Sequence, residues 1–260
     1  MIEKINLVYF SAAGTTKAVS IHLAESMGRE INEYDLLRQP PRQPVAFESD
    51  APALFAMPVY AGRIPAVCAD ALRQFRGRNT PTIAVVTYGN RDFDDALLEL
   101  KNILSENGFM VVAAAAVVAQ HSIFPHVASG RPDASDKQKI AAFGQTCSEA
   151  LNGFTDAAKI SVKGNTPYCK PMAIPLQPAG NARCSTCGAC VKVCPTKAIM
   201  AESPRKTDKS RCITCTACIA TCPQNARGFR GPLYAVAGKG FAAMTKTRKE
   251  PEFFTSNHQL

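Results

Sequence analysis

The 260-residue sequence predicts an α/β fold, a doubly wound parallel sheet, followed by a small cysteine-rich α+β domain. Two observations lead to this prediction. Continuous apolar segments alternate with amphipathic ones through the first 150 residues, and eight of the eleven cysteines lie between Cys184 and Cys222. The alternation is typical of parallel strands that helices cover on both faces.

The elements of the first domain follow from its hydrophobic periodicity. Strands are expected at Ile5–Phe10, Glu33–Leu37, Ala53–Met57, Thr82–Tyr88 and Met110–Ala119. Helices are expected at Thr15–Met27, Ala66–Phe75, Asp94–Asn107 and Ala134–Leu151. Five strands and four helices of these lengths suit a doubly wound sheet of about 150 residues.

The rhythm of strands and helices breaks after this domain. Four prolines, at positions 167, 171, 175 and 178, punctuate the next stretch, which predicts a linker or an extended arm. We therefore expect a first domain over residues 1–152, a linker over 153–180, a second domain over 181–231 and a basic tail over 232–260. The tail shows no clear period beyond one short helix.

Composition and charge exclude several classes of protein. The longest apolar run, Phe109–Ala119, is far shorter than the ~20 residues of a membrane span, so no membrane span is expected. The N-terminus lacks the features of a secretory signal, and a cytoplasmic location is expected. Residues 1–150 carry a net charge of −2 and residues 151–260 one of +11, which together give the total of +9. The basic half either steers an acidic partner or offsets negative charge held locally.

The cysteines form two runs of identical spacing. CSTCGACVKVCP begins at Cys184 and CITCTACIATCP at Cys212, 28 residues later, and both read C-x2-C-x2-C-x3-C-P. Eight of the sixteen aligned residues are identical, which indicates an internal duplication. Density of this kind in a cytoplasmic chain predicts metal ligation rather than disulfides. Two structural zinc sites are the alternative, although zinc sites usually use two cysteine pairs separated by a longer loop.

These runs resemble those of bacterial dicluster ferredoxins, which bind two [4Fe–4S] clusters. In that family the fourth cysteine of each run ligates the other cluster. The resemblance implies one cluster held by Cys184, Cys187, Cys190 and Cys222, and a second held by Cys212, Cys215, Cys218 and Cys194. The other cysteines, Cys68, Cys147 and Cys169, fit neither cluster, and the first two are expected to lie in the core.

A small polar loop joins the first expected strand to the first expected helix. It contains Ser11, Ala13, Gly14, Thr15 and Thr16, and offers hydroxyls and backbone N–H groups at a helix N-terminus, where a phosphate dianion binds well. The loop is similar to the flavodoxin phosphate loop, [ST]-x-T-G-x-T. Ala13 departs from that pattern and removes one hydroxyl donor.

Two further loops follow the third and fourth expected strands and would meet the phosphate loop at one edge of the sheet. One holds Pro58, Val59, Tyr60, Ala61 and Gly62, and the other holds Thr87, Tyr88, Gly89, Asn90 and Asp92. Both are similar to the ring-binding loops of flavodoxins, and YGNRDFDDALLEL is similar to flavodoxin–ferredoxin fusions. The resemblance implies a flavodoxin-like five-stranded sheet of order 2-1-3-4-5 that binds FMN, with each tyrosine able to stack on the isoalloxazine ring. Tyrosines that merely cap the sheet edge are the alternative.

The sequence thus predicts an electron carrier in which two [4Fe–4S] clusters and FMN exchange electrons with each other and with redox partner proteins. An FMN-dependent reductase of a small molecule, fed by the clusters, is the alternative. A metal-bound module that holds nucleic acid is a third hypothesis, but no interleaved basic and aromatic run supports it, and no nucleic acid is expected as a partner. The linker also leaves a homodimer open, with the clusters of one chain meeting the FMN of the other.

Overall fold

The computed structural model describes residues 4–153, 160–172 and 174–255. Residues 154–159 and 173 of the expected linker, and 256–260 of the expected tail, lie outside the described residues. The strands are β1 (Lys4–Tyr9), β2 (Glu30–Asp35), β3 (Val45–Phe47), β4 (Ala53–Pro58), β5 (Phe75–Gly77), β6 (Thr80–Tyr88), β7 (Phe109–Val118), β8 (Ala179–Gly180), β9 (Arg227–Gly228) and β10 (Glu252–Thr255). The helices are α1 (Thr15–Ser26), α2 (Ala66–Leu72), α3 (Ala96–Glu106), α4 (Ala134–Asn152), α5 (Ala189–Val193), α6 (Ala217–Ala220) and α7 (Pro232–Met244).

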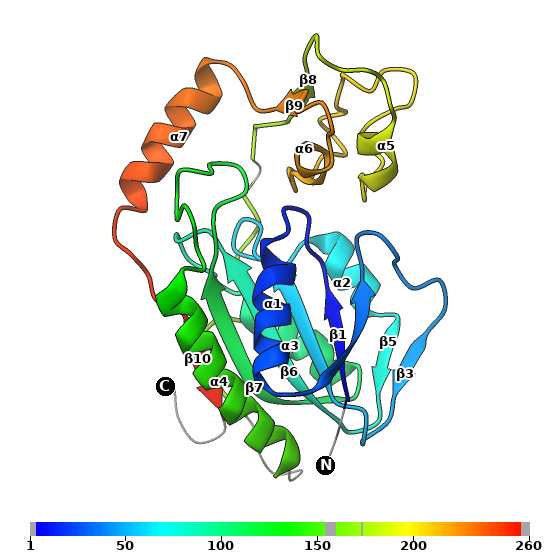
Figure 1. The fold of residues 1–260 in the computed structure, drawn as a ribbon, viewed down its shortest axis with the longest axis vertical. Helices are drawn as coiled ribbons and strands as arrows, with labels where there is room; N and C mark the ends of the chain where they lie inside the picture. The colour runs from blue at the N-terminus through cyan, green and yellow to red at the C-terminus, as the bar shows by residue number, and fades with distance from the viewer. Residues whose placement is uncertain (1–3, 154–159, 173, 256–260) are drawn as a thin grey trace.

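The main sheet has the order β10-β7-β6-β4-β1-β2, and its neighbours pair in parallel except for β10 and β7. The five expected strands are all present, and they lie in the predicted order 2-1-3-4-5. Helices α1 and α4 pack together on one face, while α2 and α3 lie on the other (Figure 1). A doubly wound sheet results, with its central strands β4 and β6 fully buried.

The prediction of a five-stranded main sheet was wrong by one strand. The tail returns to the sheet, and β10 adds an antiparallel sixth strand beside β7. Phe253 packs into the core on one face of the sheet and Phe254 into the core on the other. Strand β10 has only four residues, whose side chains alternate between the two faces of the sheet. So short a segment shows little hydrophobic periodicity, and the sequence therefore did not predict a strand here.

The tail also carries a longer helix than expected, α7, which begins at Pro232 after Gly231. Proline suits the first turn of a helix because its missing N–H has no partner there in any case. Within the described part of the chain, no helix has the length and apolarity needed to cross a membrane.

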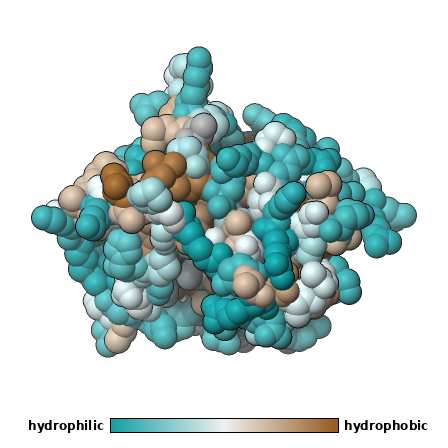
Figure 2. All heavy atoms as spheres, turned by 90° about the horizontal axis from the view of Figure 1, so that it is seen from above, coloured by the Kyte–Doolittle hydropathy of each residue, from teal (hydrophilic) through white to brown (hydrophobic). Residues whose placement is uncertain are grey.

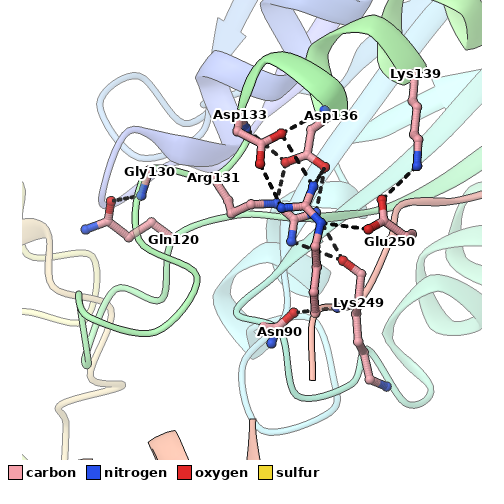
Figure 3. Close-up of polar contacts among 10 residues, drawn as sticks. Asn90, Gln120, Gly130, Arg131, Asp133, Asp136, Lys139, Lys249 and Glu250 are labelled. Atoms are coloured by element: carbon pink, nitrogen blue, oxygen red, sulfur yellow. Dashed lines mark hydrogen bonds and ion pairs between the residues drawn. The ribbon is translucent and has the colours of Figure 1, made fainter. Parts of the chain in front are cut away.

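A network of polar contacts holds the returning tail (Figure 3). Arg131 forms a buried ion pair with Asp136 at the start of α4 and donates to the carbonyl oxygen of Lys249 at 3.0 Å. Asp136 also completes a capping box with Asp133. The Asn90 side chain accepts from the Lys249 N–H at 2.9 Å. The tail is therefore fixed to the loops that follow β6 and β7.

The second domain stands above the carboxyl ends of the parallel strands (Figure 1). It consists of two short helices, α5 and α6, and the ribbon formed by β8 and β9. Residues Ile213, Cys215 and Ala217 pack with the same hydrophobic core as the β4 and β6 side chains. The expected linker is also anchored to the first domain: Asp95 accepts from the N–H groups of Asn165 and Cys169.

Candidate functional site

Two cavities adjoin at the carboxyl ends of β4 and β6. The smaller one is lined by residues of the predicted phosphate loop and of both predicted ring loops. Its lining is Ala13, Thr15, Thr16, Pro58, Val59, Tyr60, Thr87, Tyr88, Gly89, Ala119, Gln120, His121 and Ser122. Three loops far apart in the sequence thus meet as the parallel topology predicts.

The N-terminus of α1 faces this smaller cavity. The helix begins after Gly14, whose φ of 91° lies in the left-handed region that favours glycine. Because glycine has no side chain, the N-cap residue makes no side-chain hydrogen bond to the helix. The lack of a side-chain cap at Gly14 and the positive end of the helix dipole favour a phosphate there. Thr16 hydrogen-bonds to Thr87 at 2.7 Å, and Ser11 accepts from the N–H of Lys17 at 3.0 Å. Ser11 and Gly14 do not line this cavity. Ser11 instead holds the first turn of α1 through the Lys17 N–H, and Gly14 provides the left-handed turn before the helix.

The larger cavity has a volume of 480 Å³ and is mainly apolar. It shares Val59, Tyr88, Gly89 and His121 with the smaller one and also takes in Ala61, Gly62 and Asp92. The Tyr88 hydroxyl is buried without a hydrogen-bond partner among the described residues. A helix N-terminus without an N-cap side chain, next to an apolar chamber, fits a flavin mononucleotide, because the phosphate needs N–H donors and the ring needs apolar surface.

Two of the predicted FMN residues have other partners. Asn90 donates to the carbonyl oxygens of Thr245 and Thr247, at 2.8 and 3.0 Å, and does not line either cavity. Asp92 pairs with Lys163 and Lys249. Burial opposes ionisation of Asp92, but the N–H of Asp94 and these two ammonium groups hold its pKa below the ordinary value. Asn90 therefore supports the loop without lining the space for the ring, whereas Asp92 supports the loop and also lines the larger cavity.

His121 was given no role by the sequence, yet it lines both cavities. Burial lowers the pKa of its imidazole to about 4, and His126 adds to the effect. Its Nδ1 accepts from the N–H groups of Ile123 and Phe124, and its ring stacks on Phe124. A neutral histidine is thereby fixed between the two chambers. Its place after β7, at the same edge of the sheet, was the signal in the sequence.

The eight predicted ligand cysteines gather in the second domain as two groups. The first group, Cys184, Cys187, Cys190 and Cys222, lines one small cavity together with Arg227. In the second group, burial raises the pKa of Cys215 to about 12, and the nearby thiols of Cys218, Cys194 and Cys212 add to this rise. Each group takes its fourth member from the other run, which is the predicted exchange.

Backbone contacts repeat between the two runs. The Ala198 N–H donates to the Cys194 sulfur and the Ala226 N–H to the Cys222 sulfur, each at 3.2 Å and each four residues after the cysteine. The internal duplication seen in the sequence is therefore also a duplication of structure. Such N–H···S bonds stabilise thiolates and tune the clusters that they ligate.

Orphaned polar groups beside these cysteines also fit sulfur-rich clusters. Burial raises the thiol pKa values of Cys190 and Cys218, and the positive charge of the buried Arg227 opposes this rise. Its Nε and the Thr216 hydroxyl have no hydrogen-bond partner among the described residues. Over the same residues, no three His, Cys, Asp or Glu side chains converge tightly enough for a single metal ion.

The remaining cysteines belong to neither group, although Cys68 shares a hydrophobic core with Cys215. Cys68 and Cys147 are buried in the core, as expected, and burial raises the pKa of each thiol. Cys169 is half-buried, and its N–H is held by Asp95.

Comparison with known proteins agrees with the second domain. Residues 179–223 match the 4Fe-4S dicluster domain family, which assigns the chain a role in electron transfer. No curated protein matches the chain.

Solved structures resemble part of this chain at low identity. Rubredoxin:oxygen oxidoreductase from Desulfovibrio gigas is 18% identical with a TM-score of 0.44, over 58% of this chain and 36% of that one. A flavodoxin from the domain Archaea is 13% identical with a TM-score of 0.42, over 57% of this chain and 99% of that one. A WrbA-like flavodoxin from Agrobacterium tumefaciens is 14% identical with a TM-score of 0.43, over 59% and 99%. This chain therefore spans about a third of the length of the D. gigas protein.

The fold and the site define the class of protein. The strand order of this chain is that of a flavodoxin-like α/β fold, and a 4Fe-4S dicluster domain follows it. The chain thus joins a flavodoxin-like domain to a ferredoxin-like one.

Proposed function

We propose that the chain binds FMN and two [4Fe–4S] clusters and passes electrons between them as an internal relay. One observation carries the proposal: a predicted ring loop of the flavin site touches a ligand loop of the second cluster. The Tyr60 hydroxyl donates to the carbonyl oxygen of Cys215 at 3.4 Å. Both residues belong to one hydrophobic core, so packed side chains join the two predicted sites at this point.

The two clusters would follow one another away from the flavin. Cys190 and Cys218, one from each ligand group, lie in the same small hydrophobic cluster. Cys187, from the first group, is exposed. This order supports a path from the surface through the first cluster and the second cluster to FMN. FMN would supply one- and two-electron chemistry to this path.

Residues of this chain would hold each group in place. The loop before α1 would bind the phosphate, and Tyr88 and Val59 would line the space for the ring. The fixed, neutral His121 would keep a polar but uncharged group beside the ring, since burial favours the neutral imidazole. Because the contact between the sites lies within one chain, the relay does not require a second copy.

Anaerobic reconstitution with stepwise reduction tests the proposal. We expect about eight irons, about eight acid-labile sulfides and about one FMN per chain, and both chromophores should bleach. Zinc in place of iron would contradict the clusters, and full clusters without flavin affinity would contradict the flavodoxin-like site. The small-molecule reductase differs in one result: a substrate added to the reduced protein, with no partner protein present, would reoxidise the flavin, and with an excess of reductant it would be reduced over many turnovers.

A further inference from the structure

The larger cavity has walls that no flavodoxin-like loop supplies. The loops after β4, β6 and β7 form one side of it. The other side consists of α7 and the segment around Met172, Ile174 and Leu176. The tail, which the sequence left without a role, therefore takes part in the site.

Helix α7 turns one stripe of residues toward the cavity. Leu233, Ala237, Gly240, Phe241 and Met244 all line it, and their spacing of three and four residues is one face of an α-helix. Small residues stand in the middle of the stripe and large ones near its ends. A Cβ atom built on Gly240 would meet nothing within 4 Å. The helix therefore presents a shallow hollow to the cavity.

The helix is held firmly against the first domain. The Tyr234 hydroxyl donates to the carbonyl oxygen of Ile123 at 2.8 Å, and its ring stacks on Phe124. Phe241 packs on His121 with 4.6 Å between ring centroids. Just beyond the helix, Asn90 binds the carbonyl oxygens of Thr245 and Thr247. The wall of the cavity is thus a docked element.

Apolar side chains remain exposed at this wall. Leu233 is 57% exposed, Met244 66% and Met172 69%. Figure 2 shows hydrophobic surface gathered on one side of the upper face, the side on which α7 lies in Figure 1, among mostly hydrophilic side chains. Apolar surface concentrated beside a cavity marks a ligand site.

We propose that α7 is the outer wall of the flavin site, and that Ala237 and Gly240 make the hollow that would receive the isoalloxazine ring. The inference rests on the proposed binding of FMN. It assigns the large cavity to the ring because this cavity is apolar and continuous with the phosphate loop through Val59, Tyr88 and Gly89. A ring enclosed in this way would exchange electrons with the chain's own clusters rather than with an outside protein.

Filling the hollow tests this proposal. Ala237→Phe would place an aromatic ring in the cavity, and Gly240→Leu would place a branched side chain there. We expect each variant to weaken FMN binding at least about tenfold, because overfilled sites exclude their ligands. The readout is titration of FMN fluorescence with flavin-free protein, with iron content and circular dichroism as checks on folding.

The matched control is Val236→Phe. Val236 neighbours Ala237 on the same helix but is 70% exposed and does not line the cavity. Its FMN dissociation constant should stay within about twofold of the wild type. Gly240→Leu is not expected to unfold the helix, since leucine favours a helix more than glycine does. It should keep α7 intact while it blocks the flavin.

A second readout follows the exposure of the flavin to solvent. Iodide should quench the residual fluorescence of bound FMN much less than that of free FMN. If both filling variants bind FMN as the wild type does, α7 is not the wall, while the proposed function stands. If the wild type itself takes up no FMN, the proposed function fails and this inference fails with it.

Discussion

At the scale of single residues, the buried Arg131–Asp136 pair has a large energetic consequence. Asp136 is fully buried and accepts from Arg131, from Arg248 and from the backbone N–H of Asp133. Removing one partner of a buried pair leaves an uncompensated charge, which typically costs about 3–5 kcal/mol. The pair holds the tail carbonyl of Lys249, so its loss would also release the tail.

We expect Asp136→Ala to lower the free energy of unfolding by about 3–5 kcal/mol in urea denaturation. Lys139→Ala is the control, because its ion pair with Glu250 is nearly half exposed on both sides. That change should cost no more than about 1 kcal/mol. Equal losses in the two variants would show that the buried pair has no special weight.

His121 predicts a dependence of stability on pH. Its pKa is about 4 in the fold, below its ordinary value of 6.5. Between these values the unfolded chain binds the extra proton, so stability is complete above pH 6.5 and falls as the pH drops toward 4. The shift corresponds to a loss of up to about 3 kcal/mol, reduced by partial exposure of the ring.

His121→Gln should flatten this part of the pH profile, measured as urea unfolding between pH 7.5 and 5. Acidic groups such as Asp92 and Asp133, whose pKa values are depressed, act in a lower window. They lose their contribution only as the pH falls below the ordinary range of carboxyls. If the unfolding free energy of His121→Gln falls with pH as steeply as that of the wild type, another group causes the pH dependence.

At the scale of elements, β10 closes one edge of the sheet. Phe253 stacks on Phe143 of α4 with 4.5 Å between ring centroids, and it is buried. Truncation of a buried phenylalanine typically costs about 3–5 kcal/mol. Phe253→Ala should therefore lower the unfolding free energy by about that amount, whereas Glu252→Ala, on the same strand and half-buried, should change it far less. A negligible effect of Phe253→Ala would mean that the tail does not stay in the sheet.

The exchange of fourth cysteines between the two runs has its own test at this scale. Cys222→Ala should reduce the iron content from about eight to about four per chain. Adding Cys184→Ala should remove no further cluster, because both cysteines would ligate the same one. Adding Cys212→Ala instead should remove nearly all the iron. If the pair of losses is reversed, so that Cys222→Ala with Cys184→Ala removes nearly all the iron while Cys222→Ala with Cys212→Ala removes only about half, each run holds its own cluster.

The elements differ in how well the sequence predicted them. Strands such as β6 and β7 are long apolar runs, and buried parallel strands need nothing else to be recognised. The cysteine runs carry their chemistry in their spacing. The tail was misjudged because β10 is short and because its contacts with Arg131 and Asn90 depend on loops over 100 residues away. The same distance in sequence hid the role of Asn90.

At the scale of the whole molecule, the chain folds back on itself around the site. The first domain supplies the loops, the second stands above their ends, and the tail returns to the sheet (Figure 1). The Tyr60–Cys215 contact and the cavity wall of α7 both result from this path. One chain would therefore be sufficient for the proposed electron transfer between the clusters and the flavin.

The most direct test of this account is the rate at which electrons move from the clusters to FMN. In the reconstituted protein, a flash-generated reductant should reduce the clusters first, and flavin absorbance should then change with first-order kinetics. The account predicts that this rate constant stays the same when the protein is diluted tenfold, because donor and acceptor share one chain. A rate that falls in proportion to concentration, or a flavin that never receives the electrons, would contradict it.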